Sequence, residues 1–351
     1  MRSWRTWLGI LISGVFLYLA FRQQDLGEIR DALGEANFWW IPLALLFYFI
    51  GVWIRAIRWR FLLRPLVETS ARSLFPIVVV GYMANNVLPL RAGELVRSYL
   101  LSRNMGIRKT SGLATIAVER LFDGLTMLGF IFIAMSFVSL TNQLENLAVI
   151  AATLFGCLLV GLFLLTLGGG VVERLLQVVL GPLPNVLSER VERLAQAFLS
   201  GLGVLKRRRD LAAVAGTSIL AWSFEAAMYF TIARGFGPAI RETIGVFETL
   251  LTTGAANMAT LIPSSPGYIG VFESAILLVL NGALGVPQAQ VLAYAIVVHA
   301  TLLVPITLLG IIEWIRQQVS LKHVHEQRSD PTMPVDPSST PVAGAGSPPK
   351  S

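Results

Sequence analysis

Long apolar stretches recur along most of this chain, and they restrict its fold more than any other feature. A run of about 20 apolar residues is long enough to cross the hydrocarbon core of a bilayer as a helix. Because lipid cannot satisfy open backbone groups, we predict an all-α, polytopic integral membrane helical bundle. The expected spans are residues 4–21, 38–54, 111–140, 147–167, 211–233, 243–262, 267–280 and 289–315.

The composition agrees with a membrane protein and argues against nucleic-acid binding. The chain is 54% hydrophobic and 14% charged, whereas soluble domains carry about 25% charged residues. Its net charge is +7, but membrane proteins collect Arg and Lys on their cytoplasmic side. No basic soluble domain is evident, so we expect no nucleic-acid partner.

Metal, cofactor and catalytic signals are weak. Cys157, the one cysteine, lies inside an apolar run, and the histidines are His299, His323 and His325. The H-x-H pair near the C-terminus is more often solvated than metal-binding. We see no nucleophile–base arrangement and no P-loop pattern. The sequence therefore predicts no metal, no cofactor and no enzymatic activity.

The basic residues predict the orientation. If the N-terminus is inside, all of the 28 Lys and Arg residues but Arg22, Arg30, Arg234 and Arg241 fall inside. This asymmetry predicts a bacterial-type plasma (inner) membrane location with both termini in the cytoplasm. A cytoplasmic connection after the second span would hold Arg55, Arg58, Arg60, Arg64 and Arg72.

The stretch NNVLPLRAGELVR, residues 85–97, places polar residues where a span should be most apolar. Arg72 and Arg91 flank only 18 residues, and both are expected on the cytoplasmic side. Two crossings need about 40 residues. We therefore predict a re-entrant hairpin near residues 72–90, in which Asn85 and Asn86 satisfy backbone groups left open at Pro89.

A second interrupted stretch, GAANMATLIPSSPGYIGVFES, covers residues 254–274. Like residues 81–94, it runs from Gly through Asn and Pro to Gly and Glu. Paired interruptions in the two halves of a membrane chain point to a transport site, and they allow an inverted repeat. The sequence leaves open whether residues 243–283 cross the membrane or re-enter it. A helix that starts near Gly267 would offer free N–H groups to an anion.

Arg91, Glu94 and Arg97 are spaced by three residues, so they share one helix face. They either form a solvated helix start with an internal ion pair, or they form a basic mouth that binds a lipid phosphate. In the second case Glu94 would hold the arginines in place. Their position beside the predicted hairpin favours the lipid-binding interpretation.

Glu119, Arg120 and Asp123 interrupt the third span. Glu119 and Asp123 are four residues apart and face the same way. Charges inside a span usually face a cavity or one another. The cluster either neutralises an arginine of another helix or contributes to a site, and the two roles are compatible.

Single ionisable residues inside spans are site hypotheses by default. We favour a site role for Glu225, and structural roles for Glu248 and His299. Three further segments complete the organisation. Residues 25–40 and 186–209 are expected to lie on the membrane surface, and 324–351 are rich in Pro and Ser and predict a disordered cytoplasmic tail.

The motifs NNVLPLRAGELVR, ERLFD and NMATLIPSSPGYIGVFE, in this order, resemble the lysylphosphatidylglycerol synthase transmembrane-region family, also called flippase-like domain proteins. The resemblance covers roughly residues 5–320. It implies one flippase-like transmembrane domain at 1–320, with about six to eight membrane helices, the re-entrant hairpin near 72–90 and a broken pair near 243–283. This region is similar to the flippase part of multiple peptide resistance factor, which moves aminoacylated phospholipid between leaflets.

The resemblance implies that the chain moves a lipid, either an anionic or aminoacylated phospholipid or a polyprenyl-linked lipid. The alternatives are a membrane subunit or enzyme of lipid head-group modification, in aminoacyl-phospholipid or glycolipid synthesis, and a small-solute carrier. The lipid, the energy source and the oligomeric state stay open, and a homo-oligomer is allowed. The candidate residues for head-group binding and translocation are Asn85, Asn86, Pro89, Arg91, Gly93, Glu94, Arg97, Glu119, Arg120, Asp123, Glu225, Asn257, Pro263, Ser264, Pro266, Gly267, Gly270 and Glu273.

Overall fold

The computed structural model describes residues 4–21, 25–88, 92–138, 153, 208–261 and 264–317. Within these ranges the regular structure is helical throughout, which confirms the predicted all-α class. The expected span at 147–167, most of the segment 186–209 and the tail at 324–351 lie outside the described residues. So do Cys157, His323 and His325.

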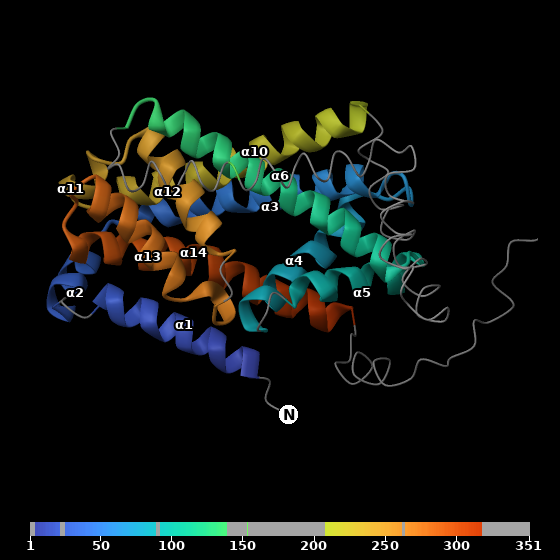
Figure 1. The fold of residues 1–351 in the computed structure, drawn as a ribbon, viewed down its shortest axis with the longest axis horizontal. Coiled ribbons are helices and arrows are strands. Elements are labelled where there is room, and N and C mark those ends of the chain that lie inside the picture. Colours follow the sequence, from blue (N-terminus) through green and yellow to red (C-terminus); the bar gives the residue numbers. More distant parts are fainter. Residues whose placement is uncertain are drawn as a thin grey trace, which may run out of the picture. The chain divides into compact units, whose positions relative to one another are not determined.

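Figure 1 shows the described helices, coloured along the chain. They are α1 (Trp4–Phe21), α2 (Leu26–Gly34), η1 (Phe38–Trp40), α3 (Ile41–Leu63), α4 (Ala71–Val87), α5 (Gly93–Met105), α6 (Lys109–Met135), α10 (Arg208–Arg234), α11 (Pro238–Arg241), α12 (Val246–Ala259), η3 (Pro266–Tyr268), α13 (Val271–Leu277), the π-helical η4 (Leu278–Ala283) and α14 (Gln288–Arg316). All but the end of α14 belong to one compact unit, Met1–Glu313, and a second unit begins at Trp314.

Within the described ranges, four helical segments are long and apolar enough to cross a membrane. They are Phe38–Leu63, Arg209–Arg234, Pro266–Ala283 and Gln288–Arg316. Each reaches the length of about 17–25 residues that a hydrocarbon core requires. The chain is therefore a multi-pass membrane protein, as its composition predicted.

The helix α3 runs further than the sequence indicated. The predicted end at residue 54, with Arg55 and Arg58 in a cytoplasmic connection, is wrong, because α3 continues to Leu63 and buries both arginine side chains. A prediction based on hydropathy ends a span at the first charged residues. A helix can nevertheless carry charges further into the membrane when its neighbours supply partners for them.

The centre of the unit is the pair α3 and α10, which pack along each other, while α6 packs against α12. Met127 and Phe130 of α6 join Trp222 and Ala226 of α10 in a buried hydrophobic cluster. This packing brings α3, α6 and α10 together, so several of their polar residues pair across the helix contacts.

The helices α4 and α5 pack against each other as a hairpin whose turn lies between Val87 and Gly93 (Figure 1). A single helix, α4, thus fills most of the range 72–90 in which the sequence predicted both arms. Asn85 near the end of α4 accepts a hydrogen bond from the N–H of Gly93 at 2.9 Å. A Cβ on Gly93 would overlap the carbonyl oxygen of Gly81, so the two helices touch through glycine. With 17 residues, α4 is about 26 Å long, which falls short of a hydrocarbon core of about 30 Å. The depth of this hairpin in the membrane stays a prediction.

The second interrupted stretch also breaks the helix in the structure. After α12 the chain passes through η3, and α13 begins only at Val271, not near Gly267 as predicted. The reason is the backbone: Gly267, Tyr268 and Gly270 have φ values of 72°, 59° and 90°, which no right-handed helix accommodates. The break sits against α1, because the N–H of Ser265 donates to Ser13 Oγ at 2.9 Å.

Candidate functional site

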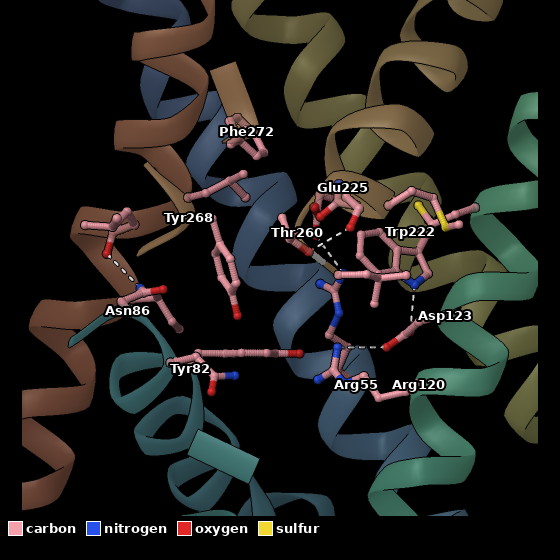
Figure 2. A pocket seen from close by; sticks show the side chains of 18 of the residues that line it. Arg55, Tyr82, Asn86, Arg120, Asp123, Trp222, Glu225, Thr260, Tyr268 and Phe272 are labelled. Atoms are coloured by element: carbon pink, nitrogen blue, oxygen red, sulfur yellow. Dashed lines mark hydrogen bonds and ion pairs between the residues drawn. The ribbon is translucent and has the colours of Figure 1, made fainter. Parts of the chain in front are cut away.

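A cavity of about 160 Å3 opens between α3, α4, α6, α10, α12, α14 and the second break. Figure 2 shows its polar side chains pointing toward one another from these different helices. Of the residues predicted for the site, seven line the cavity: Asn85, Asn86, Glu94, Arg120, Asp123, Glu225 and Asn257. The cavity thus gathers groups from both interrupted stretches and from the spans between them.

Arg55 and Glu225 form a buried ion pair at 2.6 Å across the contact between α3 and α10. The Arg55 guanidinium also lies over the ring of Trp222, 4.5 Å from its centroid. Charge on Glu225 is tolerable at this depth because a cation faces it directly. Glu225, predicted to have a site role, is therefore paired with Arg55, which the sequence analysis had placed in a connection between spans.

Arg58 reaches the two carboxylates that the sequence placed on one face of α6. Its guanidinium lies 2.6 Å from Asp123 and 3.2 Å from Glu119, and it donates to Ser218 Oγ at 3.0 Å. Asp123 also accepts a hydrogen bond from the indole N–H of Trp222 at 2.7 Å. The spacing of four residues between Glu119 and Asp123 thus presents both to one arginine.

Arg97 is buried and faces Glu119 through two parallel hydrogen bonds, each of 2.9 Å. Its guanidinium stacks over Trp59 at 4.2 Å from the ring centroid. This is the bidentate fork that arginine forms with carboxylates. Arg97 is therefore a structural link behind the cavity wall and has no place in a solvated basic mouth.

Arg120 faces the cavity and is surrounded by acids. It lies 3.2 Å from Glu94, 3.2 Å from Asp123 and 3.6 Å from Glu119. Glu94 thus pairs with α6, where the sequence suggested that it would hold the arginines of its own helix. Pro89, Arg91 and Pro263 lie outside the described residues, so the hypothesis of a phosphate bound by Arg91 stays a prediction.

One face of α4 lines the cavity with uncharged polar groups. Tyr82, Asn85 and Asn86 follow each other at helical spacing. Asn86 donates from its amide nitrogen to Thr307 Oγ1 of α14 at 2.9 Å (Figure 2). Each amide therefore uses one of its two polar atoms to hold the hairpin in place, and its other polar atom is left for the cavity.

At the second break, the sequence suggested an anion bound to a free helix start. The chain supplies that anion itself, because Glu273 Oε2 accepts the N–H of Gly270 at 2.7 Å. Its other oxygen lies 2.5 Å from His299 Nδ1, and the His299 ring packs on Phe272 at 4.5 Å between centroids. His299, expected to be structural, is thus both a partner of Glu273 and a lining residue of the cavity.

The remaining predicted residues have local roles. Asn257 Nδ2 donates to the Thr253 carbonyl at 3.0 Å and lies 3.4 Å from the Tyr229 hydroxyl. Glu248 accepts the N–H of Gly245 at 3.0 Å and so caps the start of α12, in line with its predicted structural role. The backbone of the break itself is formed by Ser264, Pro266, Gly267 and Gly270.

Several lining residues escaped the sequence reasoning: Arg55, Tyr82, Trp222, Tyr268 and Phe272. Aromatic residues in an apolar run carry no signal, since most of them pack in the core. Arg55 did carry a sequence signal, because it stands one residue beyond a predicted span and is followed by further apolar residues. Extending that span by one helical turn would have exposed the anomaly.

The whole cavity falls within a known membrane family. The family described as lysylphosphatidylglycerol synthase TM region matches residues 6–310, which is most of the chain. The chain belongs to this family. The matched range includes every residue that lines the cavity and both helix breaks.

Curated relatives of this family member differ in length. Glycosyltransferase AglD of Haloferax volcanii is 28% identical over 323 residues, which cover 83% of this chain and 51% of that protein, so the chain spans about half of it. A UPF0104 membrane protein of Methanothermobacter thermautotrophicus is 27% identical over 289 residues, covering 77% of this chain and 83% of that protein. Another, of Methanocaldococcus jannaschii, is 24% identical over 197 residues, covering 56% and 78%.

Proposed function

We propose that this protein moves a lipid head group between the two leaflets of its membrane. The observation that carries the proposal is the cavity with ion pairs buried among helices that are otherwise apolar. Charges at membrane depth are costly and mark the paths of polar substrates. Two broken helices border the cavity, and such breaks supply the binding sites of many transporters.

We propose transport in preference to catalysis. Each cavity carboxylate among the described residues is engaged by an arginine, so it lacks the freedom of a general base or nucleophile. His299 is held by Glu273. This arrangement shapes a polar space and offers no reacting group to a substrate. We place the protein in the plasma (inner) membrane with both termini in the cytoplasm, as the basic residues predict.

A second candidate function draws on the comparison with AglD, whose name describes it as a glycosyltransferase. This chain spans about half of that protein, with 51% covered. It could then act as a membrane subunit that presents a lipid to a separate head-group-modifying enzyme. Both functions require a lipid head group in the cavity, but only the first requires movement between leaflets by this chain alone.

The test is lipid movement by the purified full chain in liposomes with fluorescent phospholipid and glycolipid reporters. A membrane-impermeant reductant then reports how much reporter reaches the outer leaflet. Replacing a whole buried ion pair with apolar residues of similar size is often tolerated by the fold. The informative variant is therefore the double substitution Arg55→Met with Glu225→Leu, which empties the cavity of one pair.

The matched control is Arg64→Met with Asp210→Leu. This pair, at 2.7 Å, joins Arg64, which directly follows α3, to α10 outside the cavity, and the Arg64 side chain is 45% exposed. We expect the wild type and the control to move lipid and the Arg55 and Glu225 variant to lose this activity, with equal size-exclusion profiles. Equal movement by both double variants would refute a role for the cavity. A wild type that moves no lipid would favour the subunit function.

A further inference from the structure

Among the described residues, the ion pairs at the cavity wall and directly behind it form a balanced set. Four arginines each lie within 3.2 Å of a carboxylate, and each of the four carboxylates that they face contacts an arginine. Figure 2 shows two of these groups, Arg55 and Glu225, in direct contact at the cavity wall. The arginines are Arg55, Arg58, Arg97 and Arg120, and the carboxylates are Glu94, Glu119, Asp123 and Glu225.

A compensated set of this kind disfavours an ionic ligand. A phosphate would need positive charge that no carboxylate already balances, and an ammonium group would need a carboxylate that no arginine already balances. Binding either one would pull a buried pair apart and leave the displaced charge without a partner, which is strongly unfavourable. The described charges therefore build the wall of the cavity, and they leave recognition to other groups.

Uncharged residues of the cavity wall also carry spare hydrogen-bonding capacity. On α4, Asn85 uses its amide oxygen for the N–H of Gly93, and Asn86 uses its amide nitrogen for Thr307. Among the described residues, the Asn85 amide nitrogen, the Asn86 amide oxygen and the Tyr82 hydroxyl have no hydrogen-bond partner. These atoms offer donors and acceptors at one face of the cavity without any charge.

Tyr268 brings an aromatic ring to the same space from the second break. Figure 2 shows Tyr268 and Tyr82 pointing into the cavity from two different elements. The backbone of Tyr268 has φ 59°, a left-handed conformation that costs free energy for any residue but glycine. Backbone strain of this kind clusters at active sites and ligand sites. The neighbours Gly267 and Gly270 take left-handed conformations without such a cost.

We propose that the cavity takes an uncharged, hydroxyl-rich head group, namely a sugar ring carried by a lipid. The sugar ring lays its C–H face on Tyr268, and its hydroxyls bond to Asn85, Asn86 and the Tyr82 hydroxyl. Each of these partners is neutral, so no buried ion pair has to open. That the sugar is carried by a lipid rests on the proposed function. The cavity itself adds the class of the head group.

Binding is tested first, apart from movement. The purified chain in detergent is incubated with equal amounts of glucosyl-diacylglycerol, phosphatidylglycerol, phosphatidylethanolamine and lysyl-phosphatidylglycerol. The amount of each lipid that stays bound is measured by native mass spectrometry. We expect the glucosyl lipid to be retained about tenfold more than each of the others, a difference in affinity well within reach of a few hydrogen bonds. Equal or better retention of any charged or zwitterionic lipid overturns the assignment.

Variants locate the binding in the cavity. Tyr268→Leu removes the ring and should lower glucosyl-lipid retention about tenfold, whereas Tyr268→Phe keeps the ring and should restore it. Tyr82→Phe removes one hydroxyl only and should lower retention less. Tyr18→Leu, at an exposed tyrosine of α1, is the matched control and should change nothing. Wild-type retention in Tyr268→Leu, or equal loss in Tyr268→Phe, contradicts the stacking role.

Two further arms separate the possible failures. Free glucose in large excess should not displace the glucosyl lipid, and displacement would show that the cavity serves a soluble sugar. In liposomes, movement of glucosyl lipid in preference to phosphatidylglycerol supports both proposals. Selective retention without movement would refute the transport function and leave the substrate class intact. Movement of phospholipid without preference for the glucosyl lipid would support the transport function and refute the substrate class.

Discussion

Arg97 of α5 and Glu119 of α6 are joined by two parallel hydrogen bonds, each 2.9 Å long, and both side chains are buried. The same Glu119 carboxylate lies 3.2 Å from Arg58 of α3. One acid therefore ties three helices together, and the hairpin that carries the first break is anchored to the centre of the protein by charge. The cavity wall depends on this anchor, because Glu94 sits on α5, one turn before Arg97.

Replacement of Arg97 should detach the hairpin of α4 and α5 from the helices at the centre of the protein. Arg97→Met leaves Glu119 with weaker partners, and breaking a buried pair costs about 3–5 kcal/mol. Arg97→Lys should rescue little, since lysine cannot form the planar fork. Arg103→Met on the same helix replaces an exposed arginine and should stay within about 0.5 kcal/mol of the wild type. Thermal unfolding of the purified proteins, followed by size exclusion, gives the comparison. Equal stability of the Arg97 and Arg103 variants would show that the anchor is dispensable.

A methyl group at the turn of the hairpin should be poorly tolerated. A Cβ on Gly93 would overlap the Gly81 carbonyl oxygen and crowd the Asn85 side chain, so Gly93→Ala should cost about 1–3 kcal/mol. Gly216→Ala in α10 meets open space and should gain about 0.5–1 kcal/mol, because alanine restricts the unfolded chain. The same unfolding assay distinguishes the two. A neutral Gly93→Ala would mean that α4 and α5 can separate freely.

Relief of the strain at Tyr268 should stabilise the protein and harm binding. Its left-handed backbone costs about 1–2 kcal/mol, and glycine gives back about 0.5–1 kcal/mol through its freedom when unfolded. Tyr268→Gly should therefore raise the unfolding temperature slightly while abolishing retention of glucosyl lipid. Both are measured on one preparation, by thermal unfolding and native mass spectrometry. Loss of stability in this variant would make the tyrosine a packing element.

The hairpin of α4 and α5 should enter and leave the membrane on one side. Arg72 near the start of α4 and Arg103 near the end of α5 are both exposed, and α4 is shorter than each of the four candidate spans. In a Cys157→Ser background, cysteines at positions 72 and 103 should both react with a membrane-impermeant maleimide added from the cytoplasmic side. Reaction from opposite sides would turn the hairpin into a crossing.

Much of the helix pattern follows from the sequence alone. Apolar runs predicted the helices, and Pro, Gly and Asn predicted both interruptions, because hydropathy and backbone preference act over a few residues. Local chemistry also predicted that Glu119 and Asp123 share a face, and one arginine does contact both. The start of α13 was misplaced, because Tyr268 adopts a conformation that its residue type does not indicate.

The charge pairing of the cavity was decided only by the tertiary structure. Arg55 meets Glu225 across 170 residues of sequence, and Arg58 meets Asp123 across 65. A sequence shows that a charge stands at the edge of an apolar run, but it does not show which distant helix brings a partner. That partner decides the outcome. Without a partner, the free energy of burying the charge would end the helix at Ile54. With a partner, α3 continues to Leu63 and Arg55 lines a cavity.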